Sequence, residues 1–446
     1  MSRPSLVHVV GAGLAGLAAA VRLADAGVRV ILYEAAPQAG GRCRSYRDQA
    51  LGCRIDNGNH LLISGNRAAL RYLAAIGAAD SLIGPDEAEY PFVDVASGER
   101  WVLRPGAGWL PAWLFDRRRR VPGTGPLDYL KALPLAWAGR ERTVSEALDP
   151  ESMIFRRLWQ PLAVAVLNTE AETGSARLLG RVLGDSFARG GGACRPLVPR
   201  EELSQSFVEP ALRHLQERGA EIRFGARLRA INFAGARVAG LQFEPGTETV
   251  GAAQAVVLAV PAPVAVRLVP ELDAPDAFRA IVNAHYRIAL AAPAPLFIGI
   301  IGGVAEWVFR KRAVLSVTVS AADRLADLPA ETLSQRLWHD VARAYALPLE
   351  PMPPVQIVKE RRATFAATPE QLARRPAAAT RWANLALAGD WTATGLPATI
   401  EGAVRSGDAA AARLLDMAPI AEKSLSAPGP RATLPPDPPS VHQTLP

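Results

Sequence analysis

The sequence predicts an α/β fold in which a domain with a parallel sheet is interleaved with a second domain of α+β type. Three observations lead to this prediction. Residues 5–35 follow the order strand, glycine turn, helix, strand, which is one βαβ unit. Short strand-like pieces and a stretch rich in Trp and Pro interrupt the α/β pattern over residues 86–192. The pattern returns over 193–265, and a last strand, turn and helix follow near the end of the chain.

The expected domain boundaries lie where the pattern changes. The parallel-sheet domain is expected to combine 1–85, 193–265 and 376–417, and the second domain to combine 86–192 and 266–375. The stretch 418–446 has eight prolines among its 29 residues and few large apolar groups, which predicts a disordered tail.

Composition excludes several classes of protein. The chain has 446 residues, with 50 Lys and Arg against 43 Asp and Glu, and its formal net charge is +7. Only four of the cations are lysines, so the excess of arginine suits an anionic surface, but no nucleic-acid-binding module accompanies it. The three cysteines lack the spacing of a zinc site or a disulfide framework. We therefore expect no metal, no nucleic acid and a cytoplasmic location.

The apolar N-terminus is not interpreted as a secretory signal or a membrane span. Glycines at fixed spacing interrupt it, and it continues into an amphipathic helix and a second apolar strand at 28–33. Elsewhere no stretch reaches about 18 uninterrupted apolar residues, the length that a spanning helix needs. We expect no transmembrane segment.

The sequence G-A-G-L-A-G begins at Gly11, between the first strand and the helix. Gly11 permits the tight turn, Gly13 lets backbone approach a pyrophosphate, and Gly16 lets the helix pack against the strand. Glu34 ends the second strand, where a carboxylate accepts hydrogen bonds from ribose hydroxyls. These features predict a Rossmann-like dinucleotide site rather than a tight turn in an ordinary α/β domain. The residues between the last two glycines, Leu14 and Ala15, belong to the same candidate site.

A second glycine segment indicates that the dinucleotide is FAD. Gly40-Gly41-Arg42 follows Glu34 after a short loop. An arginine there reaches the diphosphate or the flavin ring, and the glycines allow the backbone to approach closely. An NAD dehydrogenase has no use for this loop.

A third segment, near the end of the chain, completes the prediction of FAD. Gly389 and Asp390 follow a strand, and Asp390 is a candidate to hold the ribityl or pyrophosphate group. The helix expected after them offers free N–H groups and a partial positive charge to the flavin edge that becomes negative on reduction. The alternative is a plain capped helix. The candidate residues at the start of this helix are Thr399, Ile400 and Ala403.

These motifs resemble those of the FAD-dependent amine oxidase and phytoene desaturase superfamily over nearly all of residues 5–415. Within it, the chain is similar to the hydroxysqualene dehydroxylase family. The motifs that carry this similarity are D-N-G-N-H (56–60), L-W-Q-P-L-A-V-A-V-L-N-T (158–169), L-V-P-R-E-E-L (197–203), E-W-V-F (306–309), K-E-R-R-A-T-F (359–365) and G-D-W-T-A-T-G-L-P-A-T-I-E-G-A-V (389–404). Asn59 departs from the family pattern, in which we expect Gln.

The resemblance implies an amine oxidase/desaturase type of fold with FAD as cofactor. It implies reduction of hydroxysqualene to squalene, with loss of water and hydride from N5 of the reduced flavin, in hopanoid or triterpenoid biosynthesis. It also implies that the backbone of Leu228 lies against the adenine. The sequence identifies neither the electron donor that reduces FAD nor the oligomeric state.

The implied reaction needs an acid near the flavin and an apolar site that excludes water. His60 alone among six histidines lies in a flavin-loop motif, so it is a candidate proton donor; a structural role and direct flavin contact are the alternatives. Asp56 either orients His60 or closes the turn. Glu401 is a second candidate acid, although a helix N-terminus favours its anion. Four residues either line the substrate site or are plain core: Trp159, Asn168, Trp307 and Trp391.

The segment 109–138 has the composition of an interfacial membrane anchor. W-L-P-A-W-L-F-D-R-R-R-R (109–120) places aromatic and aliphatic side chains beside four consecutive arginines. Rings at headgroup depth and guanidinium groups on lipid phosphates predict peripheral binding to anionic lipid on the inner face of the cell membrane. The alternative is a corner of the substrate domain with a solvated run of charges.

Two other functions remain open on the same fold. An oxidative carotenoid- or squalene-type desaturase uses the same FAD scaffold but moves hydride toward the flavin. A flavin-free prenyl-binding chaperone would not need Arg42 and Asp390 intact. An amine oxidase is disfavoured, because none of the seven tyrosines lies in the C-terminal flavin segment, where an aromatic cage would require them.

Overall fold

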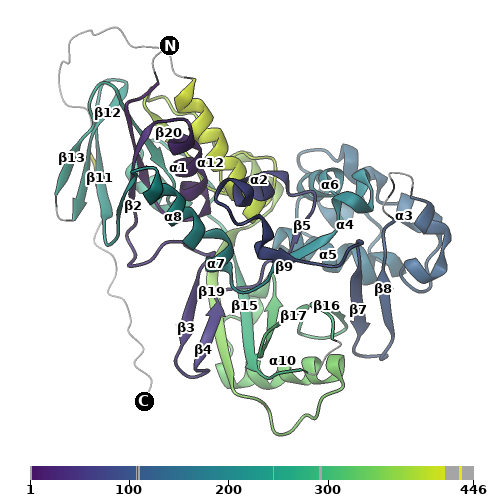
Figure 1. Ribbon diagram of the computed structural model, residues 1–446. Helices are drawn as coiled ribbons and strands as arrows, with labels where there is room; N and C mark the ends of the chain where they lie inside the picture. The colour runs from purple at the N-terminus through teal and green to yellow at the C-terminus, as the bar shows by residue number, and fades with distance from the viewer. Residues whose placement is uncertain are drawn as a thin grey trace.

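The computed structural model describes residues 3–106, 108, 111–244, 246–290, 294–416 and 431–433. A five-stranded parallel sheet with the order β10-β2-β1-β14-β20 forms the centre of the upper part in Figure 1. Strand β1 (LVHVV) is buried along its whole length, which is typical of a parallel strand covered on both faces. The five strands are β10 (Glu221–Arg223), β2 (Arg29–Tyr33), β1 (Leu6–Val10), β14 (Gln254–Leu258) and β20 (Leu385–Leu387).

Helices cover one face of this sheet and bury alternate residues of its strands, such as Val7 and Val9 of β1. The first and last of these helices, α1 and α12, pack closely because residue 407 is glycine. A Cβ atom there would lie 2.3 Å from the carbonyl oxygen of Ala15. The covering helices are α1 (Leu14–Asp25), α2 (Arg67–Ala75), α7 (Leu203–Phe207), α8 (Glu209–Glu217) and α12 (Ile400–Leu415).

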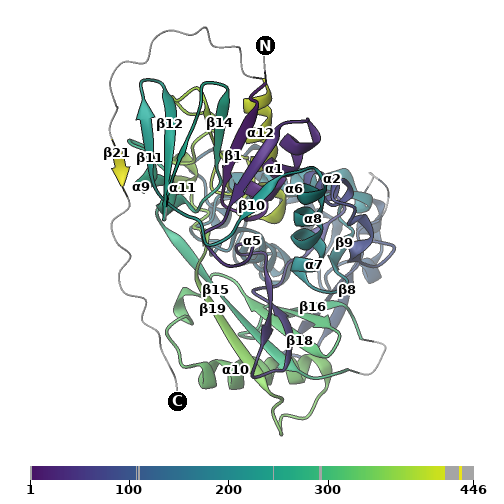
Figure 2. The same ribbon diagram turned by 60° about the vertical axis from the view of Figure 1, so that its left-hand side comes forward.

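A four-stranded antiparallel sheet, β13-β12-β11-β21, covers the other face. Figure 2 shows it beside β14 and β1. Strand β21 pairs with β11 through three residues that the sequence places in a disordered tail, so that expectation is wrong for Arg431–Thr433. The remainder of 418–446 lies outside the described residues. The strands are β11 (Arg227–Ala234), β12 (Arg237–Glu244), β13 (Thr247–Thr249) and β21 (Arg431–Thr433), with α9 (Ala262–Leu268) and α11 (Pro369–Ala373) nearby.

A seven-stranded mixed sheet, β19-β15-β18-β17-β16-β7-β8, forms the lower part of the molecule in Figures 1 and 2. Helix α10 (Ala330–Tyr345) covers one face and buries alternate strand residues, including Val317 and Val319. The residues between them in the sequence therefore lie on the opposite face, toward the five-stranded sheet. The strands are β19 (Val355–Phe365), β15 (Phe278–Arg287), β18 (Val314–Val319), β17 (Trp307–Lys311), β16 (Phe297–Ile301), β7 (Tyr90–Asp94) and β8 (Arg100–Leu103).

Short strand pairs lie between the large sheets. They are β3 (Ser45–Asp48) with β4 (Cys53–Asp56), and the three strands β5 (Leu62–Ile63), β9 (Pro196–Pro199) and β6 (Leu82–Ile83).

Residues 112–193 form short helices at the right-hand end of Figure 1. The sequence predicts two helical segments in this region, near 127–138 and 153–167. In the structure the first is a short α3 followed by a 3₁₀ turn, and the second begins with a π-helical turn before α5. The α-helices of this region are α3 (Pro126–Leu130), α4 (Val144–Ala147), α5 (Gln160–Leu167) and α6 (Ala176–Asp185). Short 3₁₀ or π turns lie between them at Ala112–Phe115, Arg117–Arg119, Leu133–Trp137, Phe155–Trp159, Phe187–Arg189 and Gly191–Ala193. Two further 3₁₀ turns lie elsewhere in the chain, at Ala79–Ser81 and Ala322–Arg324.

The sequence predicts one long helix over residues 201–218, but the structure has two helices there, α7 and α8. The break falls at Val208, two residues before Pro210, which lacks the N–H that would continue the hydrogen-bond ladder from α7. Among the described helices, none is long and apolar enough to cross a membrane.

Candidate functional site

The glycine turn between β1 and α1 leaves open space at the N-terminus of the helix. A Cβ atom on Gly13 would have no heavy atom within 4 Å, whereas one on Gly16 would lie 1.8 Å from the carbonyl oxygen of Gly11. Gly11 itself has a φ of +106°, which favours glycine. Leu14 and Ala15 form the first turn of α1, whose N–H groups have no acceptor within the helix. The turn therefore presents free donors to a space that side chains leave clear.

Glu34 is held in place from both sides at the end of β2. Its two carboxylate oxygens accept hydrogen bonds from the backbone N–H groups of Ala12 and Ala36, both at 2.8 Å. Its carbonyl oxygen accepts from Ala226, two residues before Leu228. The structure thus brings the candidate ribose ligand next to the candidate adenine contact. Leu228 is buried on β11, where the ladder is irregular between it and Ala230.

The second glycine segment lies against the first. Gly40 donates from its N–H to the carbonyl oxygen of Ala12 at 2.8 Å, and a Cβ on Gly41 would lie 3.4 Å from the Cα of Gly13. Both Gly40 and Gly41 have positive φ values, +107° and +55°. Side chains at these two positions would be strained, and one at Gly40 would also lie 2.7 Å from the carbonyl oxygen of Cys43.

Arg42 connects this loop to the end of the chain. Its Nη2 lies 2.6 Å from Oδ2 of Asp390, and its Nη1 donates to the carbonyl oxygen of Ala363 at 2.5 Å. Gly389, beside Asp390, has a φ of +148° and leaves room for the indole of Trp391. That indole donates to the carbonyl oxygen of Val260 at 3.0 Å, so Trp391 is a buried packing residue.

Helix α12 begins as the sequence predicts, with Thr399 as its N-cap. The Thr399 hydroxyl accepts a hydrogen bond from the N–H of Gly402 at 3.0 Å, and the Thr399 carbonyl oxygen accepts from Ala403 at 2.8 Å. The prediction of a free N–H at Ala403 is therefore wrong, because the first full turn of the helix uses it. The N–H groups of Ile400 and Glu401 precede that turn and remain the candidate donors.

The segments named so far fit FAD. Two glycine turns, a carboxylate oriented at the end of the second strand, and an arginine paired with Asp390 bring residues 11–42 together with the turn before the last helix. Such a set supplies backbone donors for a pyrophosphate and an acceptor for a ribose.

A buried polar network faces this set from the seven-stranded sheet. Asn59, in the D-N-G-N-H loop, donates from Nδ2 to the hydroxyls of Ser316 and Thr318 at 2.7 and 2.9 Å. Thr318 donates in turn to Asn283, and Ser316 lies 2.7 Å from Nδ1 of His285. Asn59 Oδ1 and His285 Nε2 are buried without a partner among the described residues. The sequence analysis missed this network; its signal is the alternation of polar and apolar residues in V-L-S-V-T-V at 314–319.

His60 lies near two cations as well as near Asp56, whose charge opposes theirs and raises the pKa of His60. Burial, assisted by the charges of Lys311 and Arg42, lowers the pKa of His60 to about 4. His60 therefore carries little charge at neutral pH, which disfavours it as the proton donor that the sequence suggests.

Asp56 does not orient His60 through any described hydrogen bond. Its Oδ1 accepts from the hydroxyl of Ser45 and from the N–H of Leu203, and its Oδ2 pairs with Lys311. Asp56 therefore joins the β3–β4 hairpin to α7 and to β17. Burial opposes its charge, but Lys311 and these hydrogen bonds outweigh burial and lower the pKa of Asp56.

The surroundings of Glu401 do not suit a proton donor. Its two carboxylate oxygens accept from the N–H groups of Ala68 and Ala69 at the start of α2, and Arg405 Nε donates to it at 2.8 Å. All three donors stabilise the anion, so Glu401 caps α2 and is not a candidate proton donor.

The other three predicted substrate residues, Asn168, Trp159 and Trp307, differ in what surrounds them. Asn168 is structural, because it accepts from Ala321 and donates to Thr364 while ending α5 with a φ of +48°. Trp159 is buried in the core, although its Nε1 has no partner among the described residues. Trp307 lines a cavity between α5 and the seven-stranded sheet.

The fold and this site define a flavin-dependent oxidoreductase. A family model described as flavin containing amine oxidoreductase matches residues 14–292 and 304–415. The chain belongs to that family and, within it, to the hydroxysqualene dehydroxylases, as the next comparisons show.

A hydroxysqualene dehydroxylase of Rhodopseudomonas palustris is 51% identical over 408 residues, covering 91% of this chain and 97% of the relative. One from Zymomonas mobilis is 44% identical over 407 residues, with 91% and 98% covered. The amine oxidase fold predicted from the sequence is confirmed by solved structures. A putrescine oxidase variant covers 92% of this chain and 98% of its own at a TM-score of 0.66 and 17% identity, and cyclohexylamine oxidase from Brevibacterium oxydans covers 93% and 99% at 0.65 and 17%. The predicted FAD cofactor is confirmed with the family.

Proposed function

We propose that the chain reduces hydroxysqualene to squalene with loss of water. The observation that carries this function is the similarity along nearly the whole chain to hydroxysqualene dehydroxylases, at 51% identity to one of them. The alternatives are not favoured. The relative described as a probable zeta-carotene desaturase is 28% identical and covers only 54% of this chain. A flavin-free chaperone is disfavoured because the Arg42–Asp390 pair is intact.

Bound FAD, once reduced, supplies the hydride that replaces the hydroxyl of the substrate. The chain's own residues hold the cofactor and exclude water. We assign Glu34 to the ribose, the backbone of Gly13 and Gly41 to the pyrophosphate, and Arg42 with Asp390 to the segment between the pyrophosphate and the flavin. The first turn of α12 then faces the flavin edge, where its partial positive charge stabilises developing negative charge.

The test is anaerobic incubation of the FAD-loaded protein, chemically reduced, with hydroxysqualene. Squalene is the expected product, in an amount that matches the flavin oxidised. No squalene from the reduced protein, together with new double bonds in phytoene or squalene from the oxidised protein, would show an oxidative desaturase instead. A colourless protein that binds prenyl chains without flavin would show a chaperone.

We also propose that the protein binds anionic membranes peripherally through an apolar patch. The patch comprises six exposed side chains on the short helices of residues 112–153. Its three most exposed members, Phe115, Leu127 and Trp137, are 80%, 73% and 78% exposed. Monomeric surfaces rarely leave so many large apolar side chains in water. The six residues are Phe115, Leu127, Leu130, Leu133, Trp137 and Met153.

The elements that carry the patch are packed against one another. The rings of Trp113 and Tyr129 meet edge to face with centroids 5.3 Å apart, which joins the turn at Ala112–Phe115 to α3. The sulfur of Met153 lies over Gly123. These contacts hold the turn at Ala112–Phe115 against α3 and Met153 against the loop before α3. In Figure 1 α3 lies at the opposite end of the molecule from β12 and β13.

The basic run beside the patch is shorter than the sequence suggests. Arg117 and Arg118 are exposed, but Arg120 is buried and Arg119 lies 3.8 Å from Asp116. Two of the four arginines are therefore available to lipid phosphates, whereas the nearby Lys131 is paired with Asp128 at 3.1 Å. Trp109, the first residue of the predicted anchor, lies outside the described residues.

A further inference from the structure

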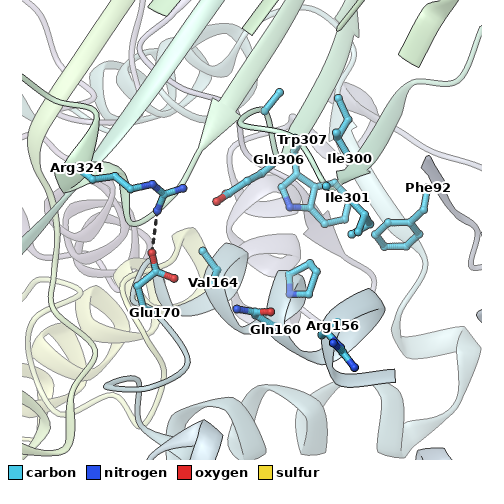
Figure 3. Close-up of a pocket in the computed structure, with 14 residues that line it drawn as sticks. Phe92, Arg156, Gln160, Val164, Glu170, Ile300, Ile301, Glu306, Trp307 and Arg324 are labelled. Atoms are coloured by element: carbon cyan, nitrogen blue, oxygen red, sulfur yellow. Dashed lines mark hydrogen bonds and ion pairs between the residues drawn. The ribbon is translucent and has the colours of Figure 1, made fainter. Parts of the chain in front are cut away.

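A cavity of about 210 Å³ lies between α5 and the turn that joins β16 to β17. Figure 3 shows Trp307 and Phe92 on one side of it and Val164 of α5 on another. Its wall mixes apolar side chains with charged and amide groups, and Trp307 meets Phe92 edge to face with centroids 5.5 Å apart. Gly299 makes this contact possible, because a Cβ there would lie 2.5 Å from the Phe92 ring. The cavity is large enough for a segment of a hydrocarbon chain.

Glu306 is a partly buried carboxylic acid in this wall. Its Oε2 accepts a hydrogen bond from the N–H of Ser320 at 2.8 Å, and no bond to Oε1 occurs among the described contacts. Figure 3 shows the carboxyl pointing into the space between α5 and the sheet. The side chain thus has one oxygen fixed by backbone and the other directed toward the cavity.

Among the described residues, Glu306 forms no ion pair, because its neighbouring cation is paired elsewhere. Arg324 is paired with Glu170 at 2.9 Å across the mouth of the cavity, and Arg156 lies on α5's preceding turn. Burial raises the pKa of Glu306 to about 7, while the Ser320 N–H and Arg324 act in the opposite direction and Glu170 adds to the rise. The carboxyl is therefore substantially protonated at neutral pH, which is the state required of a proton donor.

The cavity adjoins the polar network that faces the flavin site. Trp307, the neighbour of Glu306 in the chain, is paired with Thr318 across β17 and β18. The hydroxyl of Thr318 accepts a hydrogen bond from Asn59 of the D-N-G-N-H loop. The pair of Trp307 and Thr318 therefore connects the cavity wall to the D-N-G-N-H loop of the candidate flavin site.

We propose that Glu306 is the catalytic acid that protonates the departing hydroxyl of the substrate. This inference rests on the proposed function. The Glu306 proton forms the second O–H bond of water as the allylic C–O bond breaks and its electron pair goes to oxygen. Reduced FAD, when bound, would supply the hydride that the carbon needs and would itself be oxidised, and the Glu306 carboxylate regains a proton from solvent.

His285, which is buried, and His60, which is partly buried, are poorer donors than Glu306. The pKa of His285 is lowered to about 4 by burial and by Lys311, as is that of His60. Both imidazoles are neutral at the pH where the Glu306 carboxyl still holds its proton. They serve the site better as hydrogen-bonding groups, and the unpaired Nε2 of His285 is suited to that role.

The experiment compares wild type with Glu306→Gln, and with Glu331→Gln as a control that removes a charge from an exposed position on α10. Gln keeps an oxygen for the Ser320 N–H, so the fold and the flavin spectrum are expected to persist. We expect kcat of Glu306→Gln to fall by about 10²- to 10⁴-fold with little change in KM, and Glu331→Gln to match wild type. Wild-type kcat is expected to fall as pH rises through the Glu306 pKa.

A readout independent of turnover is the infrared carbonyl band of a protonated carboxylic acid. In the oxidised holoenzyme this band is expected to disappear as pH rises through about 7 and to be absent in Glu306→Gln. If the variant does not fold, this titration and the wild-type pH profile decide the assignment. A variant that forms squalene as fast as wild type overturns the role of Glu306 alone. A reduced wild type that forms no squalene overturns the proposed function, and the role of Glu306 with it.

Discussion

Arg42 and Asp390, 348 residues apart in the sequence, form an ion pair with 2.6 Å between Nη2 and Oδ2. The Asp390 side chain is 8% exposed and the Arg42 side chain 47%. The pair joins the glycine loop near the start of the chain to the turn before the last helix. Two segments of the candidate flavin site are therefore fixed to each other.

Arg42→Met is expected to weaken FAD binding. The substitution removes a charge-assisted donor and leaves the buried Asp390 carboxylate uncompensated beside the proposed pyrophosphate position. A hydrogen bond to a charged group contributes about 1.5–3 kcal/mol, so Kd is expected to rise by about 10- to 100-fold. Quenching of flavin fluorescence on titration with apoprotein measures it. Arg47→Met removes an exposed arginine five residues away and is expected to bind FAD like wild type; equal affinities for all three proteins would contradict the assignment.

Gly13→Ala and Gly16→Ala are expected to separate cofactor binding from folding. Gly13 has a φ of −72° and open space around its Cβ position, so alanine fits the protein but occupies space assigned to the pyrophosphate. Gly13→Ala should retain the apoprotein melting temperature and lose FAD. At Gly16 the Cβ would collide with the carbonyl oxygen of Gly11, which costs about 1–3 kcal/mol or more and lowers the melting temperature. Equal melting temperatures for the two variants would contradict this reading of the turn.

Asp56→Asn is expected to destabilise the fold, because it leaves the Lys311 ammonium buried without a counter-charge. Breaking a buried pair costs about 3–5 kcal/mol in the free energy of unfolding, measured with urea. Asp56→Asn/Lys311→Met should recover part of the loss. The control is Asp327→Asn, whose exposed pair with Arg361 should cost less than about 1 kcal/mol.

The same pair gives a pH dependence with a definite sign. Since the pKa of Asp56 is lower in the folded protein than its ordinary value of 3.8, its contribution is complete above that value. It is lost as pH falls through the folded pKa. Asp56→Asn should therefore flatten the acid limb of the stability curve, and an unchanged limb would show that Asp56 is not its source.

Glu306→Gln is expected to stabilise the protein above neutral pH. The folded pKa of about 7 exceeds the ordinary value of 4.5, so the folded state binds more protons between these values and wild-type stability falls as pH rises through them. A shift of this size amounts to about 3 kcal/mol when it is complete. The melting temperature of the variant minus that of wild type should increase between about pH 5 and about pH 8. A constant difference would contradict the raised pKa.

Phe115→Ser/Leu127→Ser/Trp137→Ser is expected to weaken binding to vesicles of anionic lipid, because these three side chains are the largest exposed part of the apolar patch. Sedimentation with vesicles measures binding. Phe224→Ser is the control, since Phe224 is 43% exposed but lies on another part of the surface. Arg117→Gln/Arg118→Gln should lower binding to anionic vesicles more at low than at high salt. Retention of vesicle binding by the triple variant would exclude the patch.

The local elements of the fold could be predicted from the sequence because their signals are local. The βαβ unit follows from residue periodicity, and α12 begins and ends at the residues that its Thr cap and apolar spacing indicate. The division into domain segments stays a prediction. The break between α7 and α8 has a local cause in Pro210, so it too was accessible from the sequence.

Contacts between distant segments were not accessible in this way. The motif places Glu401 at a helix start, but its carboxylate lies against the first turn of α2, more than 300 residues away. The pKa of His60 depends on Lys311 and burial, and Lys311 reaches the loop only because β17 and the β3–β4 hairpin face each other. A single sequence specifies which residues can titrate, whereas the packing of separate segments specifies what surrounds them.

The close packing of α12 on α1 at Gly407 has a consequence for biosynthesis. The first βαβ unit leaves the ribosome early, yet the neighbour that covers α1 and completes the flavin pocket is synthesised only when residues 400–415 emerge. Until then the apolar face of α1 lacks its last covering element, so the nascent chain exposes aggregation-prone surface for most of its translation. Loops that close over nearly the whole chain also slow folding. Cofactor capture is therefore expected to be a late, post-translational event that locks the two ends of the chain together.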